Sequence, residues 1–234
     1  MNISIIIPAY NESNRIDKTL HKIYFYMHKN KIFNKWEIVI VDDGSKDDTI
    51  KIVKKFSTKY SKNNNIRILE NKKNMGKGYS VKRGALNAKY NIILFSDADM
   101  STPISELSNF TKYISDYDVI IGTRTNKDKI KIKQPTYRLF IGKIFSIIKH
   151  IILGLNITDT QCGFKIFKGN KIFRKQKVNR FAFDVELLYL AKKNKLKIKE
   201  LDVVWKNDLQ SKVRPFRDSW NMLIEIIKIK RMHG

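Results

Sequence analysis

The chain has 234 residues, with 47 lysines and arginines against 22 acidic residues, and a formal net charge of +25 at pH 7. With 42% hydrophobic residues, it has the composition of a soluble globular protein with one sizeable domain. Its single cysteine, Cys162, excludes an internal disulfide framework and fits a reducing compartment. The charge favours a polyanionic partner, namely nucleic acid, an anionic membrane surface or a phosphorylated small molecule, although compositional drift towards lysine explains the excess about equally well.

Apolar runs alternate with helix-length segments through the first half of the chain. The run Ile3–Pro8 is typical of a strand buried on both faces, and Ser13 can cap the helix that follows to about His28. Further strands are expected at Trp36–Val41, Ile66–Glu70, Ile92–Phe95 and Val119–Gly122, and further helices at Asp47–Tyr60, Lys77–Lys89 and Ile104–Ser115. Repeated β-α-β units predict an α/β fold with a doubly wound, mostly parallel sheet.

The second half has a looser pattern. We expect a helical section at 136–154, a short element near Gly163–Phe167, a helix at 183–194, a strand at Ile198–Val204 and a final helix at 216–231. The polar stretches 61–65 and 126–133 are expected to be loops. The chain therefore reads as one domain, 1–234, with a nucleotide-binding half at 1–123 and an acceptor-binding half at 124–234.

The most informative stretch is 91–101, where an apolar run ends in two aspartates, Asp97 and Asp99. A buried strand would deliver both carboxylates to the carboxyl edge of the sheet, where ligands bind in open α/β folds. Two carboxylates this close repel each other unless a cation lies between them, and hard oxygen ligands favour Mg²⁺ or Mn²⁺. Such ions commonly bridge substrate phosphates, so this edge is a candidate metal and phosphate site.

Other strand ends carry polar groups to the same edge. The first strand is followed by an aromatic residue and a carboxylate, Tyr10 and Glu12, and the second ends in Asp42 and Asp43. A glycine-flanked lysine, Lys77, lies in a loop that leads into a helix. Each feature alone is typical of a solvated turn, but together they favour a site for a metal and a sugar nucleotide.

A basic amphipathic helix is expected at Arg138–Leu155, with Arg138, Gly142, Ser146 and Lys149 on its polar face and isoleucines, Leu139 and phenylalanines on the rest. This pattern is typical of an interfacial membrane helix, and a helix packed on the sheet is nearly as consistent with it. In the tail helix, Trp220, Leu223, Ile224 and Ile227 have core spacing. No segment is long and apolar enough for a confident membrane span.

These motifs resemble the inverting family 2 glycosyltransferases over nearly the whole chain. The motifs shared across that superfamily are Pro8–Glu12, Asp42–Ser45, Asn74–Gly78 and Asp97–Ser101, and the narrower ones are Gly122–Arg124, Asp159–Lys165, Phe183–Leu187 and Ser211–Val213. Within the family the chain is most similar to the dolichyl-phosphate (polyprenyl-phosphate) beta-glucosyltransferases. The resemblance implies the A-type nucleotide-sugar glycosyltransferase fold.

The resemblance also implies roles on the donor side. Pro8, Tyr10 and Glu12 would line the nucleoside pocket, and Asp42 would contact the base or ribose. Lys77 would lie near the donor phosphates, while the cofactor Mg²⁺ or Mn²⁺ would be held against the diphosphate by Asp97 and Asp99. Where mannosyl relatives can carry a glutamine ligand, this chain has Ser101, a poorer one.

On the acceptor side, the resemblance implies that a phosphate is received by four residues, Arg124, Arg138, Ser211 and Lys212. The candidates for catalysis and for positioning the reactants are Asp99, Asp159, Asp184 and Glu186. The apolar neighbours of Asp184 and Glu186 argue against an exposed helix turn.

The expected reaction is metal-dependent inverting transfer of a hexose, with UDP-glucose the favoured donor and a polyprenyl or dolichyl phosphate the acceptor. The alternatives are a glycan hydroxyl acceptor, which would need a general base, and mannosyl transfer from GDP-mannose. A basic nucleic-acid-binding protein is a third reading, but no zinc-finger spacing or RNP-type aromatic motif is present, so we expect no nucleic acid partner. We expect a cytoplasmic protein, peripheral on an anionic membrane surface, and a separate membrane-anchoring partner stays open.

Overall fold

The computed structural model describes residues 1–61, 65–132, 147–206 and 215–234. Its main sheet has seven strands in the order β3-β2-β1-β4-β7-β5-β8. In chain order these are β1 (Asn2–Ala9), β2 (Lys35–Asp42), β3 (Ile66–Glu70), β4 (Ile92–Ser96), β5 (Val119–Thr123), β7 (Phe164–Lys168) and β8 (Ile198–Asp202). Neighbouring strands are parallel except at β7, which lies antiparallel between β4 and β5. The doubly wound, mostly parallel sheet is thereby confirmed.

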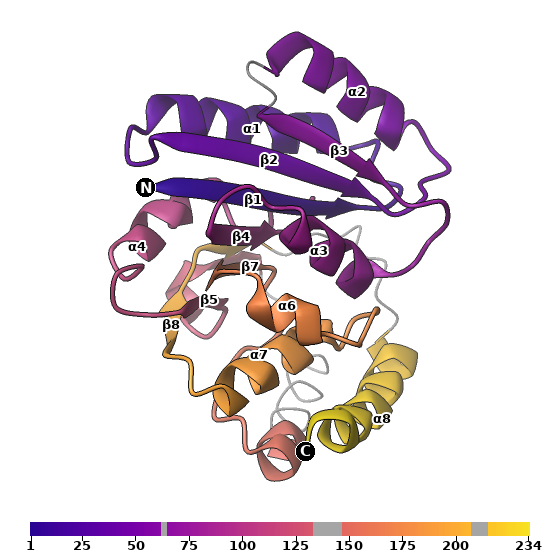
Figure 1. Cartoon of the computed structure of the whole chain (residues 1–234), viewed down its shortest axis with the longest axis vertical. Helices are drawn as coiled ribbons and strands as arrows, with labels where there is room; N and C mark the ends of the chain where they lie inside the picture. The colour runs from indigo at the N-terminus through magenta and orange to yellow at the C-terminus, as the bar shows by residue number, and fades with distance from the viewer. Residues whose placement is uncertain (62–64, 133–146, 207–214) are drawn as a thin grey trace.

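Two layers of helices cover the sheet (Figure 1). One face packs against α1 (Ile16–Lys29), α2 (Thr49–Tyr60) and α4 (Leu107–Thr111). The other packs against α3 (Lys77–Leu86), α6 (Lys171–Lys175), α7 (Phe183–Lys193) and α8 (Pro215–His233). Strand side chains alternate between the faces, so that Ile5 and Ile7 of β1 join the first core while Ile6 joins the second. Burial on both faces is why the strands read as continuous apolar runs.

Four smaller elements complete the fold of the described residues. The strands β6 (Ile130–Ile132) and β9 (Trp205–Lys206) pair in parallel, and the 3₁₀ turns are η1 (Ile104–Glu106) and η2 (Lys127–Lys129). The expectation of a loop throughout 126–133 is therefore wrong in part. Elements this short leave too little periodic pattern to be read from the sequence.

Helix boundaries differ from expectation at three places. Ser13 does not cap α1: its N-cap is Arg15, without a side-chain cap, and the Ser13 amide donates instead to Asp47 Oδ2 at 3.1 Å. The helix α3 ends at Leu86, before the predicted Lys89. The segment expected as one helix at Ile104–Ser115 is the turn η1 followed by the short α4.

The expected amphipathic helix at 138–155 is described only from residue 147, and 147–153 is helical. Lys149, predicted on the polar face, is buried, and its Nζ donates to the Ile157 carbonyl. Ile151, predicted on the apolar face, is 74% exposed. The predicted polar and apolar sides of this helix are therefore wrong. The side that packs on the sheet includes Lys149, whose aliphatic stem packs with its apolar neighbours.

A similar correction applies to α8. Ile224 and Ile227, predicted as core, are exposed, whereas Ile226 and Ile229 are fully buried. The buried side of the helix therefore differs from the expected one at these positions, and the side chains of Trp220 and Leu223, also predicted as core, lie outside the described part of the structure. Within the described parts of the chain, no helix is both long and apolar enough to cross a membrane.

Candidate functional site

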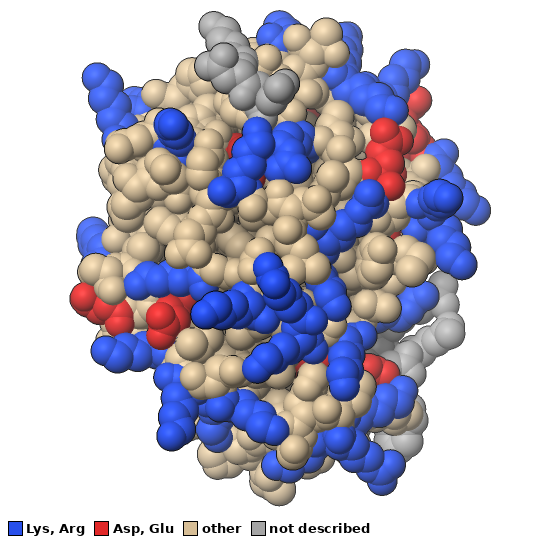
Figure 2. All heavy atoms as spheres, in the orientation of Figure 1, with Lys and Arg blue, Asp and Glu red and all other residues tan. Residues whose placement is uncertain are grey.

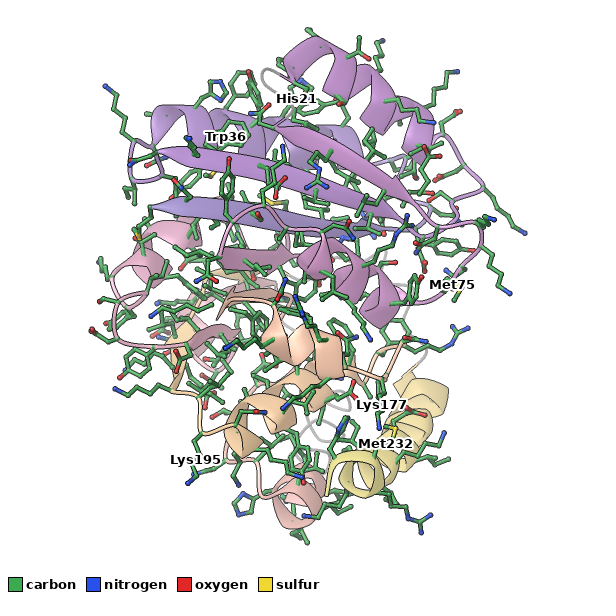
Figure 3. The ribbon with its side chains drawn as sticks, viewed as in Figure 1. His21, Trp36, Met75, Lys177, Lys195 and Met232 are labelled. Carbon is green, nitrogen blue, oxygen red and sulfur yellow. The ribbon has the colours of Figure 1, made fainter. Side chains whose placement is uncertain are left out.

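The carboxyl ends of β1, β2 and β4 meet at one edge of the sheet. The strand β1 pairs in parallel with β2 on one side and with β4 on the other, so the residues that follow all three strands are neighbours. The turn before α3 reaches the same edge, where Met75 lies close to the ends of the strand arrows (Figure 3). The acidic and basic residues predicted for the donor side are on these segments.

Asp97 follows β4 and lies against Lys77, the first residue of α3. The Lys77 Nζ is 2.7 Å from Asp97 Oδ1 and 5.4 Å from the centre of the Phe95 ring. Burial opposes the charged form of Lys77, but Asp97, Asp184 and Asp99 outweigh it and raise the pKa of the ammonium group. The lysine therefore stays charged and serves as a counter-ion to the carboxylates.

Asp99 lies two residues further, in a turn where Met100 has a φ of 52°. Its Oδ1 accepts a hydrogen bond from the Ser101 amide at 2.8 Å. Burial and the neighbouring Asp97 raise the pKa of Asp99, while Lys77 and Arg15 act in the opposite direction. Burial and the neighbouring carboxylate thus disfavour the ionised form of Asp99, and a bound cation would offset both effects.

Gly163 allows the Asp97 carboxylate to occupy its position. A Cβ on Gly163 would lie 2.8 Å from Asp97 Oδ1 and closer still to Cγ and Oδ2. The Asp97 amide donates to the Gly163 carbonyl at 3.1 Å, so backbone and side chain of the aspartate both rest on this glycine. Only a residue without a side chain fits here.

Asp42, at the end of β2, is buried, and a hydrogen-bond donor is found for one of its two carboxylate oxygens. Its Oδ2 accepts from the Ser45 amide at 3.1 Å, and its Oδ1 has no hydrogen-bond partner among the described residues. An unpaired buried acceptor is costly unless a ligand supplies a donor. This atom is therefore a candidate contact for a bound base or ribose.

The end of β1 forms the neighbouring wall. Pro8 lies within β1 opposite Val41, and Tyr10 follows the strand, half-buried. Glu12 forms an ion pair with Arg15, and its amide donates to Thr49 Oγ1 at 2.7 Å. The structure brings these predicted nucleoside-pocket residues to the same edge as Asp42.

Asp43, which the sequence did not single out for a role, holds the turn before α3. Its Oδ1 accepts from the Met75 amide at 2.9 Å and from Asn71 Nδ2 at 2.7 Å, and its Oδ2 accepts from the Gly76 amide at 2.8 Å. Gly76 has a φ of +103°, which favours glycine. These bonds hold the turn that places Lys77 at the start of α3.

Behind Lys77 lies a second, buried ion pair. Lys165 of β7 is fully buried, and its Nζ donates to Asp184 Oδ1 and to the Cys162 carbonyl. Burial raises the pKa of Asp184, although Lys165 and Lys77 oppose that shift. Asp184 therefore acts as a buried support for the two lysines, and the sequence motif gave no separate indication of Lys165.

Asp159 and Arg124 form a bidentate pair at the end of β5. Arg124 Nε is 2.6 Å from Asp159 Oδ2, and Arg124 Nη2 is 2.8 Å from Asp159 Oδ1. Burial opposes ionisation of Asp159, but Arg124 outweighs it and lowers the pKa of the carboxyl. The guanidinium also lies 5.3 Å from the centre of the Trp205 ring. A predicted acceptor residue and a predicted catalytic residue are thus partners.

Glu186 lies apart from this group. It is fully buried and accepts hydrogen bonds from the amides of Lys177 and Val178, both at 2.8 Å, while its Oε1 is 2.7 Å from His233 Nε2. Two residues after Asp184 on α7, it points to a different side of the helix. Its contacts are those of a structural residue that joins the 177–178 loop to the end of α8.

Three predicted acceptor residues, Arg138, Ser211 and Lys212, lie outside the described residues. Cys162 is buried, as expected of a small apolar side chain, and burial raises the pKa of its thiol to about 11. Such a thiol is a poor nucleophile at neutral pH.

The donor set of the aspartate pair fits Mg²⁺ or Mn²⁺. In the described parts of the chain, no group of three or more His, Cys, Asp and Glu side chains could hold a metal by itself. Magnesium is usually held by one or two carboxylates together with substrate phosphates and water, so the two aspartates suffice when a diphosphate is bound.

The comparisons with known proteins identify the family of the chain. The family model described as glycosyl transferase family 2 matches residues 4–173. The dolichyl-phosphate beta-glucosyltransferase ALG5D of Trichomonas vaginalis is 36% identical over 244 residues, which cover 97% of this chain and 72% of that protein. The human dolichyl-phosphate beta-glucosyltransferase is 32% identical, over 94% of this chain and 71% of its own.

Among solved structures, the glucosyl-3-phosphoglycerate synthase of Mycobacterium tuberculosis in complex with Mn²⁺, UDP-glucose and phosphoglyceric acid superimposes with a TM-score of 0.67. The superposition covers 98% of this chain and 78% of that one, at 14% identity. At this identity the likeness establishes the fold, and it confirms the predicted A-type glycosyltransferase architecture.

Proposed function

Because this chain belongs to glycosyl transferase family 2 and is a hexosyltransferase, we propose that it transfers glucose from UDP-glucose to dolichyl or another polyprenyl phosphate. One observation carries the proposal. Relatives named dolichyl-phosphate beta-glucosyltransferase match nearly the whole chain, whereas the general family model ends at residue 173. The likeness therefore includes the second half, which we propose to bind the acceptor.

On the donor side, the first half would hold the nucleotide. Asp42 Oδ1, buried and unpaired among the described residues, would accept a hydrogen bond from the base or ribose, beside a wall that includes Pro8, Tyr10 and Glu12. The Lys77 ammonium would move from Asp97 to the donor phosphates.

Asp97 and Asp99 would hold Mg²⁺ or Mn²⁺, and the solved neighbour that contains Mn²⁺ with UDP-glucose supports this choice. When bound, the ion neutralises the charge of the departing nucleoside diphosphate, a role that needs no protonated side chain. The residues around the pair then serve to fix the carboxylates: Gly163 seats Asp97, and the Ser101 amide orients Asp99.

On the acceptor side, the attacking group would be a phosphate oxygen of the lipid. A phosphate monoester has a second pKa of about 6, so it is largely dianionic at neutral pH and needs no strong general base. The protein must instead offset the repulsion between two anions. Arg124, oriented by Asp159, would contribute to this, together with the proposed contacts Arg138, Ser211 and Lys212.

Incubation of purified protein with radiolabelled UDP-glucose, Mn²⁺ and dolichyl phosphate tests the proposal. Label should enter the organic phase, and GDP-mannose should give little transfer. Asp99→Asn should lose most of the activity, because the cation loses half of its carboxylate charge. Excess chelator should also abolish activity, because it removes the cation. Absence of lipid-linked label with every sugar nucleotide would contradict the proposed acceptor. Full activity in chelator would contradict the proposed metal.

A further inference from the structure

Exposed apolar side chains gather at one end of the molecule. Ten large hydrophobic residues are exposed in the described parts of the chain, and five of them belong to the helical segment 147–153 and to α8. They are Ile147 (60% exposed), Ile151 (74%), Ile224 (40%), Ile227 (45%) and Met232 (36%). We call these five residues the terminal face.

The two helices of the terminal face are held together by the end of α7. Lys192 Nζ donates to the Gly154 carbonyl, just after the 147–153 helix, and Lys193 Nζ donates to the His233 carbonyl at the end of α8. Figure 1 shows the 147–153 helix and the C-terminal end of α8 at the same end of the molecule, with Met232 marked in Figure 3. The helices that carry the five apolar residues therefore lie at the same end of the molecule.

Basic side chains surround this surface. On α8, residues three, four and seven apart share a side of the helix, so Ile224 and Ile227 share their outward side with Lys228 and Arg231. The exposed Lys195 follows α7, and Lys230 lies 5.8 Å from the Tyr189 ring centre. Figure 2 shows lysines and arginines crowding the half of the visible face where α6, α7 and α8 lie, with few acidic residues among them.

We propose that the terminal face docks on an anionic lipid bilayer. Aliphatic residues interleaved with lysine and arginine match both layers of a membrane interface, since the apolar side chains enter the acyl boundary while the cations meet the headgroups. A protein partner that covered the aliphatic residues would leave the surrounding lysines and arginines without opposite charges, unless that partner were acidic. The charge of the whole molecule favours a continuous anionic surface.

The inference deepens the proposed function, because a polyprenyl phosphate is anchored in a membrane. The helix α7 connects the two places: Asp184, near its start, supports Lys77, and Lys193, at its end, lies at the terminal face. Nine residues of helix span ~14 Å. Docking at the terminal face would therefore bring the bilayer close to the acceptor half.

Flotation with vesicles, without any substrate, tests the proposal. The wild type should float with vesicles of phosphatidylcholine and phosphatidylserine, and weakly with phosphatidylcholine alone. Ile147→Asp combined with Ile151→Asp should lower partitioning at least about tenfold. The matched control is Phe25→Asp, a 56% exposed aromatic on α1 next to His21, at the far end of the molecule (Figure 3), and it should bind as the wild type does.

Charge reversal tests the electrostatic part separately. Lys228→Glu with Arg231→Glu should lower binding to anionic vesicles at low salt, and the difference should shrink as salt screens the attraction. Lys51→Glu with Lys55→Glu, on the exposed side of α2, changes the net charge equally and should have a much smaller effect. Equal losses in both double variants would show that net charge alone drives binding.

Activity in detergent separates this proposal from the proposed function. The Ile147→Asp/Ile151→Asp variant should glucosylate detergent-solubilised dolichyl phosphate as the wild type does, and should be slow only with acceptor in vesicles. Wild-type flotation by this variant, or no flotation of the wild type, would overturn the proposal. If light scattering then showed a dimer that the variant abolishes, a second copy of the chain would be the occupant.

Discussion

The substitution Gly163→Ala tests most directly whether the geometry around Asp97 makes the metal site. The added Cβ would lie 2.8 Å from Asp97 Oδ1 and closer to Cγ and Oδ2. Since an ordinary contact needs about 3.4 Å, the carboxylate must retreat by roughly 0.6 Å or more. Metal–ligand distances tolerate only about ±0.2 Å. Gly163 is not among the glycines with positive φ, so alanine adds steric conflict without backbone strain.

We expect Gly163→Ala to weaken Mn²⁺ binding about 10–100-fold, the range found when residues supporting metal ligands are changed. Overpacking should also lower the free energy of unfolding by about 1–3 kcal/mol. Isothermal titration with Mn²⁺ in the presence of UDP measures the first effect, and thermal denaturation followed by circular dichroism measures the second.

The matched control is Gly169→Ala at the other end of β7. Gly169 has a φ of +75°, and its Cβ would lie 3.3 Å from Asn91 Oδ1, away from the aspartates. This variant should lose stability but keep its affinity for Mn²⁺. If Gly163→Ala bound Mn²⁺ as tightly as the wild type, the close approach of the Asp97 carboxylate to Gly163 would not determine the metal site. That result would refute the reasoning.

Three further predictions concern the ion pairs of the site. Lys77→Met should raise the affinity of the nucleotide-free protein for Mn²⁺ several-fold, because the ammonium group no longer competes with the ion for the Asp97 carboxylate. The same variant should bind UDP-glucose more weakly. An unchanged Mn²⁺ titration would contradict the role of Lys77 as a counter-ion to the aspartates. Asp159→Asn should lower the free energy of unfolding at pH 7 by about 3 kcal/mol, because Arg124 is left unpaired. The pKa of Asp159 is lowered from 3.8, so the ion pair stabilises the fold above that pH. The difference in melting temperature between variant and wild type should therefore close as the pH falls below about 4. Lys165→Met should strongly destabilise the fold, because the Asp184 carboxyl is left buried without its lysine partner. Adding Asp184→Leu should restore part of the lost stability. If thermal melts showed that the two substitutions lower stability additively, Lys165 and Asp184 would not be coupled.

The sequence predicted the first half of the fold and the acidic residues at its sheet edge because both depend on local patterns. A strand buried on both faces must be apolar throughout, and carboxylates placed just after it, such as Asp97 and Asp99, can only lie at the sheet edge. The Asp184–Lys165 pair could not be foreseen, because it joins a helix to a strand whose insertion between β4 and β5 no local pattern specifies. The exposure of Ile151 and the burial of Lys149 were missed for a related reason: periodicity indicates that a helix has two faces, and only the packing partners determine which one is covered.

The antiparallel strand β7 has a consequence for the modularity of the chain. It pairs with β4 from residue 92 to 96 and with β5 from 119 to 121, so a strand made after residue 163 completes the sheet begun by the first 123 residues. A fragment cut at residue 123 would leave β4 with an unpaired apolar edge and β5 without either of its partners, β7 and β8, and unpaired strands are templates for aggregation. We therefore expect that neither half folds separately, although the proposed function assigns a different ligand to each. If the proposed acceptor half were exchanged between relatives, Gly163 and Lys165 would be exchanged with it, and the proposed donor site would change as well.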